Sequence, residues 1–344
     1  MSENKFLKWM TSETQTVYWH DSAVVSELEE AMANGAKGVT TNPFLINATL
    51  KSDPEYWADI IKDVPRDLKG TEKVEALMQK VTGHIAEKLM PLYETGDIRV
   101  GRCCAQTSPL KPGDKEAMLA QAKRYAAWAP NICIKLPATK HGIELAEECA
   151  ALGYNVVVTV SFTVPQCVTT GAALQRGIER ARAAGIKPGL AVSVLMVGRL
   201  DDYLRDVASD TSDIVKESDI ICAGTAAIKR SYQIFNERGY EAYLMPAGCR
   251  GAYHIADLAG ARMIMSIAPK IAVLLAEMEG PFEERIDIPV DPEVIERLMT
   301  MPEFVKAYEP DGMKPEEFIT FGSTNRTLDQ FVNSGWNPLA NHKF

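Results

Sequence analysis

Short apolar runs recur along the chain and alternate with longer stretches in which apolar residues have helical spacing. Seven of these runs predict strands at residues 16–21, 38–41, 100–106, 155–161, 190–195, 241–245 and 262–267. A further strand is predicted within residues 131–139, where Pro137 closes it because proline cannot continue a ladder. The run at 155–161 is almost continuously apolar, as is typical of a parallel strand covered on both faces.

The stretches between these runs predict helices. Helical spacing covers residues 22–34, 114–128, 140–152, 164–184 and 254–259, and residues 45–97 and 200–238 are mostly helical in character. Eight alternations of strand and helix predict an α/β chain that forms a (β/α)8 TIM barrel rather than an open sheet. Such a barrel needs roughly 250 residues. We therefore expect one domain over residues 1–344, with the barrel at about 16–280, extra N-terminal helical structure and a C-terminal helical extension at about 281–344.

Composition excludes several classes of protein. A hydrophobic fraction of 46% and a charged fraction of 24% are those of an ordinary globular chain. The net charge of −9 argues against a nucleic-acid or anionic-membrane partner. The N-terminal residues are polar and no run is long enough to span a bilayer, so the sequence predicts a cytoplasmic protein. The seven cysteines and five histidines have no metal-site spacing, which indicates reduced thiols and no metal.

A lysine interrupts the fourth apolar run. Lys135 lies between Ile134 and Leu136, where a core strand is predicted. Burial disfavours the charged form of a lysine, and a neutral amine can attack a carbonyl to form a Schiff base. The alternative is a structural ion pair between Lys135 and a nearby carboxylate, since ion pairs also perturb buried lysines.

Polar residues occur at the predicted carboxyl ends of the other strands, which is where barrels place their chemistry. These residues are Asp21, Asn42, Gln106, Thr159, Arg199 and Arg250. Five of them also have a structural alternative, which for each arginine is a surface ion pair. Asp21 could N-cap a helix, Asn42 could hold the turn before Pro43, and Thr159 could be a β-branched filler. Their common placement around Lys135 favours an active site.

Three motifs carry a resemblance to the transaldolase family. They are GVTTNPFLI at residues 38–46, IKLPAT at 134–139 followed by Gly142 and Ile143, and LAGARMIMSIAPK at 258–270. The resemblance extends over about residues 17–275, with the motifs in the family order. It implies Schiff-base chemistry without a metal or organic cofactor.

The resemblance also implies roles for individual residues. Lys135 would attack the ketone of a ketose phosphate, and Asp21 would take the C4 hydroxyl proton as the C3–C4 bond breaks. Asn42, with Thr41 beside it, would contact the bound three-carbon unit. Thr159 would help to hold a catalytic water.

Two arginines complete the implied site. Arg199 and Arg250 would bind the phosphate group, as planar guanidinium forks do. The resemblance further implies homo-oligomers, which members of the family commonly form.

The chain departs from the family pattern at three strand positions. Gln106 replaces the glutamate of most transaldolases, as in the fructose-6-phosphate aldolase branch, and can orient a water but cannot move a proton. Met196 stands where transaldolases have phenylalanine and the aldolase branch has tyrosine. The family serine on the sixth strand aligns with Val194, unless Ser193 shifts by one position and contacts substrate.

These observations predict an enzyme that transfers a dihydroxyacetone unit between sugar phosphates, in metabolism of the pentose phosphate type. One alternative is an aldolase that uses free dihydroxyacetone, which Gln106 favours and Met196 disfavours. Another is a transaldolase for a sugar that bears a different anion. A further alternative, from another class of protein, is a sugar-phosphate-binding barrel without turnover.

Overall fold

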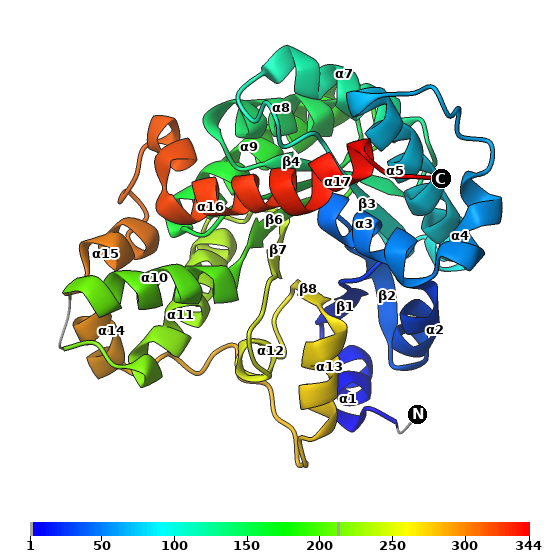
Figure 1. The fold of residues 1–344 in the computed structure, drawn as a ribbon. Helices are drawn as coiled ribbons and strands as arrows, with labels where there is room; N and C mark the ends of the chain where they lie inside the picture. The colour runs from blue at the N-terminus through cyan, green and yellow to red at the C-terminus, as the bar shows by residue number, and fades with distance from the viewer. Residues whose placement is uncertain (1–2, 212–213) are drawn as a thin grey trace.

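Eight parallel strands form a single sheet in the computed structural model, which describes residues 3–211 and 214–344 (Figure 1). The strands are β1 Val17–His20, β2 Ala36–Val39, β3 Arg102–Gln106, β4 Ile132–Pro137, β5 Asn155–Thr159, β6 Ala191–Leu195, β7 Tyr243–Pro246 and β8 Ile264–Ile267. Their order is β7-β6-β5-β4-β3-β2-β1-β8. A parallel bridge between Leu244 and Met263 brings β7 beside β8 and closes the sheet. The predicted (β/α)8 barrel is confirmed.

Helices follow the strands and cover the outside of the barrel (Figure 1). They are α2 Val25–Ala33, α3 Pro43–Ser52, α4 Pro54–Ile61, α5 Gly70–Lys88, α6 Met90–Tyr93, α7 Lys115–Ala126, α8 Lys140–Ala151, α9 Val164–Ala183, α10 Val197–Thr211, α11 Glu217–Glu237, α12 Tyr253–Ala256 and α13 Pro269–Ala276. Helix α1 Lys5–Glu13 precedes β1 and begins at Asn4, whose side chain accepts a hydrogen bond from the Leu7 amide. Residues 1–2 of the predicted N-terminal arm and 212–213 of the predicted helical stretch 200–238 lie outside the described residues.

The second strand lies two residues earlier than predicted. Thr40 and Thr41 favour strand structure as β-branched residues, but they follow β2 as part of the loop at its carboxyl end. Their hydroxyl groups bond to Asp21 and to the Cys104 carbonyl, respectively. The difference matters because residues at the carboxyl end of a barrel strand line the functional face.

The core occupies both sides of the strands, as expected for a sheet enclosed by helices. Every residue of β4 is buried, and so are all but the first residue of β5. The cysteines are free thiols, and six of the seven are buried. Among the described residues, no helix is long and apolar enough to cross a membrane.

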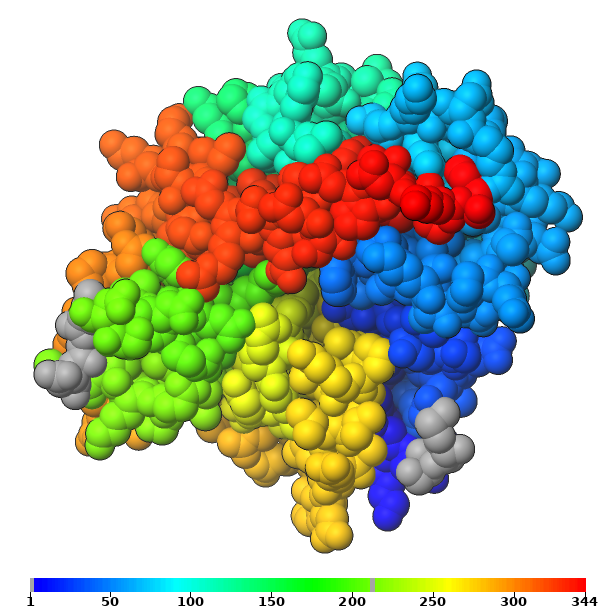
Figure 2. Space-filling model, viewed as in Figure 1, coloured from blue at the N-terminus to red at the C-terminus, as the bar shows by residue number. Residues whose placement is uncertain are grey.

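The C-terminal extension is helical, as predicted, and its last part crosses the mouth of the barrel (Figures 1 and 2). Its elements are α14 Pro292–Leu298, α15 Pro302–Tyr308, the 3-10 helix η1 Pro315–Thr320, α16 Gly322–Phe331, the π-helix η2 Val332–Trp336 and α17 Asn337–Ala340. Helix α16 packs on α10, and η2 packs on α3. Buried side chains of the extension, such as Phe318 and Trp336, belong to the same hydrophobic core as the barrel.

Candidate active site

A cavity of about 170 Å³ opens at the carboxyl ends of the strands. Its lining includes Lys135 and five other predicted site residues, which come from five different loops or strands. These residues are Asp21, Asn42, Lys135, Thr159, Arg199 and Arg250. Helices α3 and α16 form part of its rim through Phe44, Gln330 and Phe331.

Lys135 lines this cavity from near the end of β4. It pairs in register with Gln106 on β3 and Val157 on β5, and only 7% of its surface is exposed. Its amine lies 3.4 Å from the Thr41 carbonyl oxygen, to which it donates. Within residues 3–211 and 214–344, Lys135 takes part in no ion pair, so the structural ion-pair alternative finds no partner there.

Asp21 follows β1 and is held by a chain of hydroxyl groups. Thr40 Oγ1 donates to Asp21 Oδ1 over 2.7 Å and lies 2.7 Å from Ser266 Oγ. Because Thr40 gives its single proton to Asp21, Ser266 must be the donor in the second bond. The N-cap alternative for Asp21 does not apply, since α2 begins after Val24 without a side-chain cap.

Sequence reasoning missed Thr40 and Ser266 and chose Thr41 instead. The Thr41 hydroxyl donates to the Cys104 carbonyl over 2.6 Å, so only its backbone carbonyl reaches Lys135. Side chains alternate along an extended backbone, which places Thr40 and Asn42 on the side opposite Thr41. This alternation was the feature of the sequence that pointed to Thr40 rather than Thr41.

Asn42 combines a structural role with a place in the cavity. Its Oδ1 accepts a hydrogen bond from the Leu45 amide over 3.0 Å and caps α3, with Pro43 at the first position of the helix. The turn-holding alternative is therefore correct for this oxygen. The amide NH2 group of the same side chain is left to donate into the cavity that Asn42 lines.

Thr159 connects the cavity to a smaller niche. It ends β5, is 2% exposed, and lines both the main cavity and a space of about 10 Å³ that Gln106 also lines. The buried Gln106 Oε1 has no hydrogen-bond partner among the described residues. A space of this size holds about one water molecule.

The backbone beside Thr159 is strained. Val160 has a φ of 58°, in the left-handed region that a β-branched residue rarely adopts. Such a conformation costs about 1–3 kcal/mol and persists only where surrounding structure imposes it. Here the Val160 carbonyl accepts a hydrogen bond from Gln166 Nε2, and the strain occurs directly after a cavity residue.

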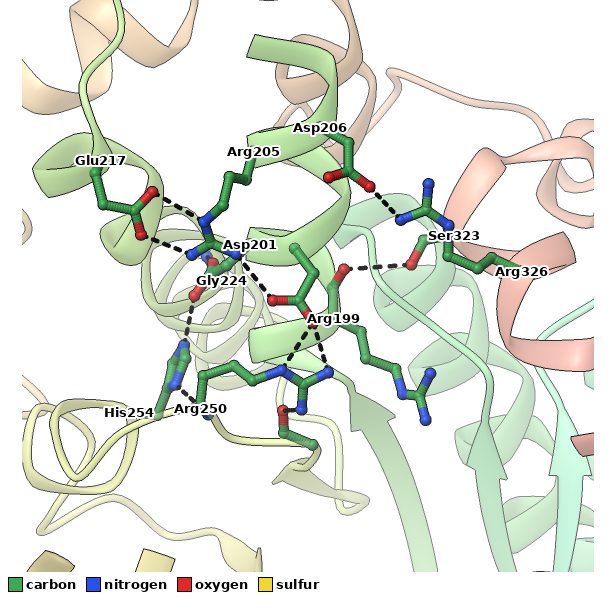
Figure 3. Close-up of polar contacts among 12 residues, drawn as sticks. Arg199, Asp201, Arg205, Asp206, Glu217, Gly224, Arg250, His254, Ser323 and Arg326 are labelled. Carbon is green, nitrogen blue, oxygen red and sulfur yellow. Dashed lines mark hydrogen bonds and ion pairs between the residues drawn. The ribbon is translucent and has the colours of Figure 1, made fainter. Parts of the chain in front are cut away.

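Arg199 and Arg250 enter the cavity from α10 and from the loop after β7 (Figure 3). Arg199 Nη1 donates to Gln330 Oε1 of α16 over 2.7 Å. Burial and, second, the charge of Arg250 lower the pKa of Arg199. Arg250 pairs with Asp202, whose Oδ2 lies 2.8 Å from Nε and 2.6 Å from Nη2.

A buried pair supports the loop that carries Arg250 (Figure 3). His254 Nδ1 accepts a hydrogen bond from the Arg250 amide over 3.2 Å, so Nε2 carries the ring proton and donates it to Asp201 Oδ2 over 2.8 Å. Asp201 Oδ1 accepts from the Gly224 amide. Sequence reasoning missed this pair because its members lie 53 residues apart.

Ser193, a predicted substrate contact, lies apart from the other predicted site residues. Its side chain is buried on β6, where it lies against Cys167 of α9, and it is not among the residues that line the cavity. Alternation along β6 directs this hydroxyl toward the outer helices. Met196, which directly follows the same strand, does line the cavity. Among the described residues, no group of three or more His, Cys, Asp or Glu side chains could hold a metal ion.

Comparisons with known proteins relate the chain to one family. A family model described as transaldolase/fructose-6-phosphate aldolase matches residues 18–318. Transaldolase 1 of Streptomyces avermitilis is 31% identical over 220 residues, which are 61% of this chain and 58% of that protein. The transaldolase of Thiobacillus denitrificans is 26% identical over 226 residues, 63% of this chain and 61% of that protein. The matched region thus spans about three fifths of the length of these relatives.

Proposed function

The chain belongs to the transaldolase/fructose-6-phosphate aldolase family, and on that premise we propose that it transfers a dihydroxyacetone unit from an anionic ketose to an aldose. The observation that carries the proposal is the amine of Lys135, which has no ion-pair partner among the described residues, in one cavity with Asp21 and two arginines. The donor would be a sugar phosphate or a sugar with a related anion. Sugar-phosphate metabolism of the pentose phosphate type and the cytoplasm are the expected setting.

The first step uses Lys135 as the nucleophile. Its amine adds to the C2 ketone of the donor and, with uptake of one proton and loss of one water, forms a protonated Schiff base. The Thr41 carbonyl, 3.4 Å from the amine, accepts an N–H of Lys135 and directs the nitrogen into the cavity. Asn42 contributes its amide NH2 to the hydroxyl groups of the bound sugar.

Carbon–carbon cleavage then depends on Asp21. Its carboxylate takes the C4 hydroxyl proton, the C3–C4 bond breaks, and the electron pair moves into the iminium to give an enamine on Lys135. The aldose product leaves. An acceptor aldehyde adds to the enamine, and Asp21 returns its proton to the new hydroxyl group. Thr40 supports this role by holding one carboxylate oxygen over 2.7 Å.

Gln106 and Thr159 are proposed to hold the water that forms and later hydrolyses the Schiff base. The niche between them, about 10 Å³, has room for about one molecule. The unpartnered Gln106 Oε1 offers an acceptor to that water. An amide cannot take up a proton, so proton transfer falls to Asp21 and the water. No metal enters this scheme.

An aldolase that releases free dihydroxyacetone is the second candidate, because the fructose-6-phosphate aldolase branch also has glutamine at the position of Gln106. Release requires a group that protonates the enamine carbon. Met196 lines the cavity at the corresponding place with a thioether, which carries no proton to give. Transfer is therefore favoured over release.

Intact mass measurement tests the proposal. The wild-type protein, Lys135→Ala and Lys270→Ala are incubated with fructose 6-phosphate and borohydride. A three-carbon adduct on the wild type and on Lys270→Ala, and none on Lys135→Ala, is expected. Lys270 is the matched control because it is the other lysine of the cavity. Folded wild-type protein that forms no adduct with this or related anionic ketoses would refute the proposal.

A further inference from the structure

Arg250 enters the cavity with much of its hydrogen-bonding capacity in use. Nε and Nη2 contact Asp202 Oδ2 at 2.8 and 2.6 Å, and Nη1 donates to the Gly248 carbonyl over 2.9 Å. A guanidinium group has five N–H donors. Two therefore remain for a ligand, and the positive charge that they carry is already paired with the Asp202 carboxylate.

Asp202 keeps its negative charge. Burial would raise the pKa of its carboxyl group, but hydrogen bonds and charge from Arg250 and Arg205 outweigh burial and hold the pKa below its usual value. Arg205 Nη1 lies 2.9 Å from Asp202 Oδ1 and continues to Glu217 (Figure 3). Arg205 and Glu217 offset each other, so they add no net charge to the cavity.

The remaining charges at this end of the cavity sum to about one positive unit. Arg199 and Arg250 contribute two positive charges and Asp202 one negative charge. Behind them, both carboxylate oxygens of buried Asp201 are occupied within the protein, by His254 and by the Gly224 amide. Elsewhere in the cavity lining, the negative charge of Asp21 is offset by the positive charge of the exposed Lys270.

Two apolar side chains lie beside Arg199 in the cavity lining. Met196 and Phe331 line the cavity, and the Arg199 guanidinium carbon lies 5.9 Å from the centre of the Phe331 ring. One Arg199 N–H already donates to Gln330. A phosphate ester carries about −1.5 to −2 charges and three acceptor oxygens at neutral pH. The two arginines and Asp202 offer such a dianion about one unit of net positive charge, which is less than the charge that it carries.

We infer that this end of the cavity selects a sugar whose terminal group carries one negative charge, such as a sulfate ester or sulfonate, over the corresponding phosphate. Asp202 is the residue that sets this selectivity, because it removes one unit of positive charge from the Arg199–Arg250 pair. The inference rests on the proposed function and names the substrate class of that same site.

Turnover of two isosteric esters tests the inference. The ratio of kcat/KM for fructose 6-sulfate to that for fructose 6-phosphate is measured for the wild type, Asp202→Asn and Asp206→Asn. Asparagine keeps an acceptor for Arg250 and removes only the charge. We expect the wild-type ratio to exceed one, and Asp202→Asn to lower it by roughly tenfold to a hundredfold, the effect of one unit charge at a partly exposed site.

Asp206→Asn is the matched control. Asp206 lies on the same helix, is exposed, and pairs with Arg326 rather than with a cavity residue. It removes the same charge from the chain, so the ratio should stay within about twofold of the wild type. A wild-type preference for the phosphate, or an unchanged ratio in Asp202→Asn, overturns the inference while the proposed function stands. Absence of turnover and of a borohydride adduct with both esters removes the proposed function and the inference with it.

A measurement on the wild type alone covers the case in which Asp202→Asn does not fold. Methanesulfonate and methyl phosphate are compared as competitive inhibitors. Methyl phosphate should inhibit more strongly at pH 5.5, where its monoanion dominates, than at pH 8, because the second pKa of a phosphate ester is near 6. Methanesulfonate should inhibit about equally at both pH values. Stronger inhibition by methyl phosphate at pH 8 overturns the inference.

Discussion

The hydroxyl group of Thr40 provides the sharpest test of how the site is built. Thr40→Val keeps the shape of the side chain and removes the donor that holds Asp21 Oδ1 over 2.7 Å. Thr40 is fully buried, so water has no access with which to replace the bond. A hydrogen bond to a charged group contributes about 1.5–3 kcal/mol. The same change leaves the Ser266 hydroxyl without its acceptor.

The loss of this hydrogen bond should slow one step of the reaction. The hydrogen bond fixes the direction of the carboxylate, so its loss should lower kcat/KM by roughly 10- to 100-fold. Formation of the Schiff base on Lys135 does not use Asp21, whereas cleavage of the C3–C4 bond does. Rapid quenching with borohydride should therefore trap a six-carbon adduct in Thr40→Val, where the wild type yields mostly the three-carbon adduct.

Thr16→Val is the control for this substitution. Thr16 is also buried, and its hydroxyl donates to the Ala261 carbonyl over 2.9 Å just before β1 begins, at the opposite end of the barrel. Thr16→Val should lose stability and keep the adduct pattern of the wild type. A folded Thr40→Val protein with kcat/KM within twofold of the wild type, and with the normal three-carbon adduct, would refute the reasoning.

Two further predictions concern the mouth of the barrel and the outer face of β1. Gly335→Ala places a Cβ 2.6 Å from the Phe44 amide nitrogen, so it should displace η2 from α3. We expect the free energy of unfolding, measured with urea, to fall by about 1–3 kcal/mol, and the KM, measured by steady-state kinetics, to rise. Burial lowers the pKa of His20 to about 4, whereas the pKa of an unfolded histidine is about 6.5. The contribution of His20 to stability should therefore be complete above pH 6.5, and the free energy of unfolding, measured with urea, should fall by about 3 kcal/mol as the pH drops toward 4.

Each of these has a matched comparison. Gly83→Ala lies in α5 with no atom near the new Cβ and should raise stability by about 0.5–1 kcal/mol; equal effects at Gly335 and Gly83 would contradict the contact argument. His20→Asn should lose this pH dependence. Glu27 lies 4.0 Å from His20 Nε2 but is 40% exposed, so burial dominates. Wild-type stability that rises as the pH falls from 6.5 to 4 would show that Glu27 dominates instead.

The sequence alone was sufficient to predict the architecture and most of the polar residues at the strand ends. Apolar periodicity is a local property, and eight alternations of strand and helix leave few arrangements other than a closed barrel. Parallel strands of a barrel end on the same rim. The polar residues after each strand could therefore be assigned to one cavity without knowledge of any contact.

Tertiary structure decided which atoms meet in that cavity. The choice between Thr40 and Thr41, and the outward direction of Ser193, depend on a backbone register that shifts by a single residue. Asp202 meets Arg250 across 48 residues, and Gln330 meets Arg199 across 131. Contacts between residues so far apart leave no periodic signal in a sequence. They form only when the barrel closes and the C-terminal extension packs over its mouth, and they set the charge that a substrate meets there.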